Sequence, residues 1–267
     1  MIRCAAITAG CAVLGGCGWV DFEARPGATS VVDLFFAQPS PLEAAQMAID
    51  PYNPNDRYRG TLLLANAPFA GEPVYLQLFE DNIKDADPSV RTAAARALAN
   101  HGQPRHVPML IEALGDEDRL VRQEAARGLQ RLHDARAINP LIRAMREETE
   151  PSADVRTEAA LALGQYAQHR VLDALIQALD DRSLTVNRAA ESSLRTLTGQ
   201  DLGLDRTVWG AWSIETTDAF AQRQPYLFPV FNRERYIIEY LPFIPRPPNE
   251  TPATPAGMPP NAEPASR

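Results

Sequence analysis

The sequence predicts an all-α protein, a right-handed α-α superhelical solenoid of about five helix pairs. Three observations carry this prediction. A pattern made of a cap residue, a Val-Arg-like pair and an Ala-rich apolar face recurs five times, the copies follow one another at intervals of 31 to 34 residues, and a second apolar helix follows each full copy. One helix pair cannot bury its apolar face alone, but stacked pairs bury a continuous core.

Each copy begins with a residue suited to start a helix. Asn, Asp and Ser side chains accept hydrogen bonds from the free N–H groups of a helix's first turn. From the first residue of each Val-Arg-like pair, apolar residues follow at the spacing of one helix face, as in Val121, Ala125 and Leu129. The pairs begin at positions 58, 90, 121, 155 and 186, and the predicted caps are Asn55, Asp87, Asp118, Ser152 and Ser183.

A second helix is predicted in each full copy, over 74–79, 109–114, 140–145 and 174–179. Three arginines recur near the starts of these helices, at Arg105, Arg136 and Arg170. Because second helices usually line the concave face of a solenoid, the hypothesis is that these arginines border a partner-binding groove. The alternative is an ordinary solvated face. The groove would also include Gln77, Glu112, Arg143 and Gln177.

At this point the repeats resemble a known family. Residues 87–98, DPSVRTAAARAL, are similar to the short bacterial HEAT-like repeats also known from phycobilisome lyase-type proteins. The resemblance covers roughly 50–200 and implies an armadillo/HEAT-like fold without specifying a function. In proteins of this kind the Arg of each pair usually binds an acidic residue of the same or the adjacent repeat. We therefore expect an internal ladder from Arg59, Arg91, Arg122 and Arg156.

The region after the repeats differs in composition. Residues 197–215 resemble an ending found in HEAT-repeat proteins of planctomycete-type bacteria, in which a Thr-Gly turn leads to a short helix with two tryptophans. Trp209 and Trp212 share a helix face and are expected to cover the open end of the stack. The aromatic stretch 226–244 has two interpretations, namely folding back over the last helices or forming an exposed strand or membrane-facing element. Residues 245–267 are Pro-rich and predicted to be disordered or extended.

The first residues indicate export and lipid attachment. Arg3 precedes a short apolar stretch that is too short to span a bilayer but suits a signal sequence. The run Leu14-Gly15-Gly16-Cys17 resembles the bacterial lipoprotein signal, which implies lipidation of Cys17 and removal of 1–16. With more than one acyl chain the protein would be held stably at a membrane. We expect it to face the periplasm, at the outer rather than the inner membrane.

Composition excludes several functions. All three cysteines lie within the first 17 residues, so the folded body has no thiol nucleophile or cysteine metal site. No Gly-x-Ser-x-Gly sequence, phosphate-binding loop or His-Glu dyad occurs, and we predict no catalytic residues, cofactor or metal. His101 is expected to be a partly buried residue at a helix end. The formal net charge of −8 makes nucleic acid an improbable partner.

These observations predict six segments: a signal peptide at 1–16, a linker at 17–39, an N-terminal cap helix at 40–54, HEAT-like repeats at 55–200, a Trp and aromatic cap at 201–244 and a tail at 245–267. The predicted function is a non-catalytic protein–protein interaction scaffold in the bacterial cell envelope, with an unknown protein partner. The alternatives are an enzyme or enzyme accessory of HEAT-like lyase type, or a protein that binds an envelope polymer through its C-terminal tail.

Overall fold

The computed structural model describes residues 39–230, 240 and 251–259. The chain divides into two compact units, Met1–Pro39 and Ser40–Arg267, and the second contains every described helix. The predicted signal peptide, the lipidation residue Cys17 and most of the linker lie outside the described residues. None of the described helices is both long enough and apolar enough to cross a bilayer.

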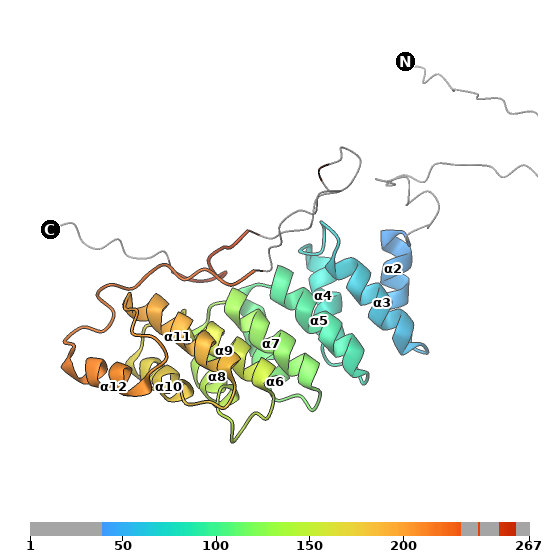
Figure 1. Ribbon diagram of the computed structural model, residues 1–267. Coiled ribbons are helices and arrows are strands. Elements are labelled where there is room, and N and C mark those ends of the chain that lie inside the picture. The colour runs from blue at the N-terminus through green and yellow to red at the C-terminus, as the bar shows by residue number, and fades with distance from the viewer. Residues whose placement is uncertain (1–38, 231–239, 241–250, 260–267) are drawn as a thin grey trace, which may run out of the picture. The chain divides into compact units, whose positions relative to one another are not determined.

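The fold is the predicted all-α solenoid, and the described residues form five helix pairs after one leading helix, α2 (Pro41–Ala48). Figure 1 shows the pairs stacked in chain order. The first helices are α3 (Pro54–Ala65), α5 (Pro88–His101), α7 (Arg119–Arg131), α9 (Ala153–Leu163) and α11 (Leu184–Thr198). The second helices are α4 (Pro73–Asn82), α6 (Val107–Ala113), α8 (Ile138–Ala144), α10 (His169–Ala178) and α12 (Arg206–Glu215), with short 3₁₀ turns η1 (Pro104–His106) and η2 (Ala135–Ala137) before α6 and α8.

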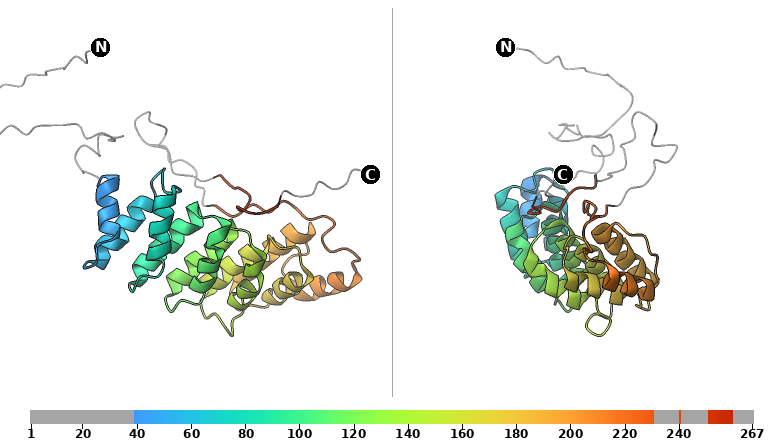
Figure 2. Two further views of the ribbon diagram at one scale, coloured as in Figure 1. Left: turned by 180° about the vertical axis from the view of Figure 1, so that it is seen from behind. Right: turned by 90° about the vertical axis from the view of Figure 1, so that its left-hand side faces the viewer.

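The first helices pack directly against one another along the stack, as both views in Figure 2 show. Small side chains on their apolar faces permit this close approach. At Gly128 in α7 an added Cβ would lie 3.3 Å from Ala99 Cβ of α5 and 2.8 Å from Leu110 Cδ1 of α6, so a larger residue there would require its neighbours to move. The equivalent leucine of each of the last four first helices is fully buried; these are Leu98, Leu129, Leu163 and Leu194.

The N-terminal end of the stack is closed by α2, which packs on α3. A capping box starts α2: Ser40 Oγ accepts from Glu43 N at 3.2 Å, and Ser40 N donates to Glu43 Oε2 at 2.7 Å. The two helices approach so closely at Gly60 that an added Cβ would lie 2.4 Å from Ala44 O. A glycine is therefore required at that position.

At the other end, Gly199 ends α11 with φ of 71°, in the left-handed conformation that favours glycine. Helix α12 then occupies the place of a second helix and contacts α10. Trp209 is fully buried there and Trp212 is partly buried, with their rings in an edge contact at 5.9 Å. The tryptophans thus lie where α12 packs on the last repeats.

The described part of the predicted tail is extended, which is one of the two predicted alternatives. In residues 251–259, Ala256 pairs with Leu132 in an isolated parallel β-bridge and Pro255 is buried. Ala256 N donates to Arg131 O at 2.8 Å and His133 N donates to Ala256 O at 2.9 Å. Backbone hydrogen bonds, which a Pro-rich composition does not reveal, hold this stretch. The rest of the predicted tail, 245–250 and 260–267, lies outside the described residues.

Candidate interaction surface

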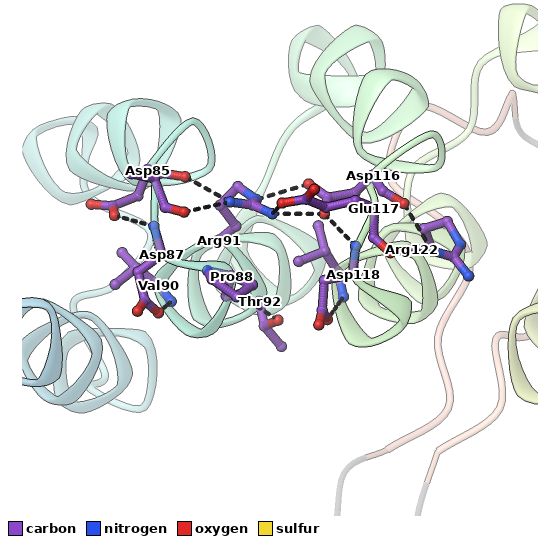
Figure 3. A network of polar contacts seen from close by, with 12 residues as sticks. Asp85, Asp87, Pro88, Val90, Arg91, Thr92, Asp116, Glu117, Asp118 and Arg122 are labelled. Atoms are coloured by element: carbon purple, nitrogen blue, oxygen red, sulfur yellow. Dashed lines mark hydrogen bonds and ion pairs between the residues drawn. The ribbon is translucent and has the colours of Figure 1, made fainter.

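A ladder of arginines and carboxylates joins the repeats (Figure 3). Arg91 binds Asp116 of the next turn through two hydrogen bonds of 2.8 Å, and its Nη1 donates to the carbonyls of Asp85 and Ala86 at the start of its own helix. Arg122 and Arg156 repeat this arrangement with Glu150 and Asp181. Each arginine therefore fixes the turn before its own helix to the turn of the following repeat.

The first rung of the ladder differs from the prediction. Arg57, not Arg59, pairs with Asp85, through bonds of 2.7 and 2.9 Å. The predicted register of the first repeat was wrong by two residues because Pro54 takes the first helical position, where its missing N–H costs little. At the far end Asn187 replaces the arginine, and its Nδ2 donates to Leu179 O at 2.6 Å.

The pKa values of two acids of the ladder, Asp85 and Asp116, are lowered. Burial alone would raise the pKa of Asp116, but hydrogen bonds from the Arg91 guanidinium and the Asp118 N–H outweigh it and leave that pKa below its ordinary value of 3.8. The pKa of Asp85 is lowered in the same way, with burial opposed by Arg57 and the backbone N–H of residue 87. The charged groups of the ladder bind one another between repeats, so the role of the ladder is structural.

The helix caps follow the prediction at four positions and depart from it at one. Asp87, Asp118 and Ser152 accept hydrogen bonds from first-turn N–H groups of α5, α7 and α9. Asn55 lies inside α3, and the cap is Asn53, whose side chain accepts from the Asn55 N–H at 3.0 Å.

Ser183 is the N-cap of α11, as predicted, but its first-turn contacts differ from those of the other caps. It lies at the start of α11 but makes no capping bond with its side chain, because its hydroxyl lies 2.8 Å from that of Thr185. The backbone N–H of Ser183 instead donates to Asp181 at 2.8 Å. The acid two residues before the cap therefore binds the backbone N–H of the cap here, as Asp116 does before α7.

The three arginines of the predicted groove are exposed, and each binds a different neighbour. Arg136 pairs with Asp134 of its own turn at 2.6 Å, and this hydrogen bond raises the pKa of Arg136. The side chain of Arg105 lies 3.5 Å from Glu80, and Arg170 donates to Gln168 and Asn139 at 2.8 Å. The three positions are thus equivalent in the repeats but not in their local partners.

The four remaining groove candidates, Gln77, Glu112, Arg143 and Gln177, are also exposed. Gln177 lines a cleft of about 520 Å³ between the turn after α8 and the end of α10, together with Met145, Glu147, Glu148 and Asp180. Two of the lining residues, Glu147 and Asp180, pair with Arg182 and Arg206. Only one of the four candidates, Gln177, lines this cleft.

The histidines have structural contacts. His101 is partly buried at the end of α5, with Nε2 2.8 Å from Ala65 O. His106 is almost fully buried between Glu80, 2.8 Å away, and the Gln103 N–H. No group of three or more His, Cys, Asp or Glu residues in the described part of the chain is arranged to hold a metal ion.

A C-terminal strap, which we define as residues 222–230 and 251–259, follows the carboxyl ends of the first helices. Figures 1 and 2 show it turning back along the stack from α12. Tyr226 is buried, its hydroxyl donates to Leu161 O at 3.0 Å, and burial raises its pKa above the ordinary value of 10.0. The fold-back alternative therefore holds for 226–230, whereas most of 231–244 lies outside the described residues.

The strap also borders a second cleft. Arg131 stacks on the ring of Phe228 at 4.7 Å, and the Phe228 N–H donates to Ala253 O at 3.1 Å, which joins the two parts of the strap. Beyond these residues a cleft of about 510 Å³ opens toward α3 and α5, lined also by Asn66 and Asn100. Sequence reasoning missed this surface, although polar residues recur at the ends of all five first helices.

Comparison with known proteins agrees with this geometry. The family model described as HEAT repeats matches residues 76–153, and the model described as PBS lyase HEAT-like repeat matches residues 155–181. The chain therefore contains HEAT-type repeats and is an α-solenoid. A comparison with curated protein sequences finds no match.

Several solved structures are similar in fold. A designed armadillo repeat protein in complex with the peptide (KR)4 is 19% identical, with a TM-score of 0.50, over 65% of this chain and 88% of that one. An engineered protein is 21% identical with a TM-score of 0.49, over 69% and 95% of the two chains. The complex of CpcE and CpcF of phycocyanin lyase from Nostoc sp. PCC7120 is 21% identical with a TM-score of 0.41, over 65% and 80%. At these identities the likeness concerns the fold alone.

Proposed function

We propose that this chain is a non-catalytic scaffold that binds another protein in the bacterial cell envelope. One observation carries the proposal: the carboxyl ends of the first helices already bind an extended polypeptide, the strap, through its backbone and side chains. A solenoid offers such extended surfaces by construction. The armadillo repeat structure that resembles this fold was solved with a bound peptide, which agrees with this role.

The proposal includes attachment to a membrane through lipid on Cys17. Its support is the sequence Leu14-Gly15-Gly16-Cys17 together with the absence of cysteine after residue 17. Acylated lipoproteins need no membrane-spanning helix, because two or more acyl chains anchor a protein stably. With this anchor, the solenoid would present its surfaces on the periplasmic side, at the outer membrane.

Metabolic labelling with a palmitate analogue tests the anchor. We expect label on the wild-type protein and on a Cys11→Ser control, and no label on Cys17→Ser. Retention of label on Cys17→Ser would overturn the anchor. The control removes a cysteine of the same segment and so separates lipidation from general effects on export.

Crosslinking in membranes tests the scaffold. Because Lys84 is the only lysine, carboxylate-reactive or photo-reactive crosslinkers are required. We expect the tagged full chain to capture a specific protein that is absent from a tag-only control, and capture of none would overturn the scaffold. Retention on purified peptidoglycan instead would favour the polymer-binding alternative, and a measurable lyase activity of the purified protein would favour the lyase-type alternative.

A further inference from the structure

One polar residue recurs near the carboxyl end of every first helix. It stands ten positions after the first residue of the Val-Arg-like pair, which in the first repeat is Asp56-Arg57. This register places the five residues at equivalent points of successive repeats, on the edge that the strap follows. They are Asn66, Asn100, Arg131, Gln165 and Thr196.

In the last three repeats the strap binds the main chain of these same residues. Gln224 N donates to Thr196 O at 2.8 Å, Arg223 Nη2 donates to Gln165 O at 2.9 Å, and Ala256 N donates to Arg131 O at 2.8 Å. The last carbonyls of a helix lack partners within the helix, and the carboxyl end carries a partial negative charge. The edge therefore accepts hydrogen bonds from an extended chain that supplies N–H, guanidinium and hydroxyl groups.

In the first two repeats the equivalent edge borders the cleft of about 510 Å³ instead. Asn66 and Asn100 are exposed there, beside Ala65 and His101, while Arg131 and Phe228 of the strap interface form one end. Among the residues that the structure describes, no carboxylate lines the cleft, although the chain has 34 acidic residues. Apart from Arg131 at one end, the cleft thus offers neutral amide groups and helix ends, which suit a polypeptide main chain.

We propose that this cleft binds an extended segment of a protein partner, whose main-chain N–H, Arg or Tyr groups donate to the ends of α3 and α5. The proposal deepens the proposed function and rests on it. Two observations select this occupant: the cleft continues the interface that the strap already forms, and donors on the strap meet acceptors on the helices. The formal net charge of −8 adds attraction for a basic over an acidic segment.

A labelled copy of the strap is a suitable probe. A fluorescein-labelled peptide of residues 221–229, AQRQPYLFP, carries the donors that the strap uses. In the full chain the strap already covers the ends of α7, α9 and α11, which leaves the cleft at α3 and α5 for the added peptide. Fluorescence anisotropy with the full-length protein then measures its affinity. A peptide with Glu in place of its Arg should bind more weakly.

Two charge-matched double variants decide the location. In Asn66→Arg/Asn100→Arg, two long cations occupy the cleft, and we expect affinity at least about tenfold lower than wild type, which is ~1.4 kcal/mol. The control Gln46→Arg/Asn55→Arg adds the same charge at exposed positions outside both clefts and should bind like wild type. Thermal unfolding checks that both variants fold, and Asn100→Arg alone is the substitute if the double variant does not.

Two results would overturn the proposal. One is the lack of saturable peptide binding, and the other is equal affinity for both double variants, which would place the peptide elsewhere, for example in exchange with the strap. Crosslinking in the cell envelope with the same variants separates a failure of the cleft proposal from a failure of the scaffold proposal. A partner captured equally by both would reject the cleft and leave the scaffold standing, whereas capture of no partner by the wild type would reject the scaffold.

Discussion

Arg156 and Asp181 form the most buried rung of the ladder, each with a side chain that is only 4% exposed. The guanidinium donates two hydrogen bonds, of 2.8 and 2.9 Å, to the two carboxylate oxygens. Its remaining amino group donates to the carbonyls of Glu150 and Pro151. One side chain therefore ties α9 and its entry turn to the turn before α11.

Removing this arginine should be costly. Arg156→Ala leaves the Asp181 carboxylate buried without its counterion, and breaking a buried pair in this way typically costs about 3–5 kcal/mol. The matched control is Arg182→Ala, because Arg182 pairs with Glu147 but is 86% exposed, and such surface pairs contribute less than about 1 kcal/mol. Urea unfolding, monitored by circular dichroism, measures the free energy of unfolding of both variants. An equal loss of stability in the two variants would contradict a structural role for the ladder.

The ladder also makes stability depend on acid. The pKa values of Asp85 and Asp116 are lower in the folded chain than their ordinary value of 3.8, because hydrogen bonds from Arg57 and Arg91 outweigh burial. The stabilising contribution of these two carboxylates to the free energy of unfolding is therefore fully present above the unfolded-state pKa. It is lost as the pH falls through the lower folded-state pKa. We expect the melting temperature to fall steeply below about pH 4. The Asp116→Asn variant should be less stable than the wild type at pH 7, and its melting temperature should fall less steeply as the pH is lowered.

The repeats could be predicted because each one is specified locally. A cap residue, an apolar helix face and an acid in the following turn lie within one period, so short-range patterns identify them. The first repeat was misregistered where the pattern is weakest, since Asp56-Arg57 lacks the valine of the other pairs. There the position of Pro54, rather than the predicted cap Asn55, determines where the helix begins.

The strap and its cleft could not be predicted in the same way. Most of their contacts are main-chain hydrogen bonds between residues far apart in the sequence, such as Ala256 with Arg131 and His133. No side-chain periodicity encodes such pairing. The ladder was expected from the resemblance to HEAT-like repeats, but which acid binds which arginine, such as Asp116 with Arg91, depends on how neighbouring repeats stack.

The tryptophans at the end of the stack should contribute unequally. Trp209 is fully buried and its Nε1 donates to Gly203 O at 2.7 Å, whereas Trp212 is partly exposed. Trp209→Phe removes packed area and leaves that carbonyl without its donor, and a buried unpaired group costs about 1–3 kcal/mol. Trp212→Phe keeps the aromatic contact and should cost clearly less. Chemical unfolding of the two variants makes the comparison, and the reverse order would contradict the end-cap role of Trp209.

Two glycines allow the contact of the strap with α11 to be measured. Gly199 and Gly203 have nearly the same backbone conformation, with φ of 71° and 73°. An added Cβ at Gly199 would lie 2.4 Å from Gln222 O of the strap, whereas at Gly203 it would meet nothing within 4 Å. Alanine at either position bears the left-handed strain of about 1–2 kcal/mol. The difference in stability between the two variants therefore measures the contact of the strap with Gly199.

We expect Gly199→Ala to be less stable than Gly203→Ala by a further ~1–3 kcal/mol, the usual cost of forcing a side chain into filled space. Hydrogen exchange should separate the two as well. In Gly199→Ala, displacement of the strap should speed exchange of the Gln224 N–H, which is bonded to Thr196 O. In Gly203→Ala that amide should stay protected. Equal stabilities together with equal protection would mean that the strap does not hold this position in solution.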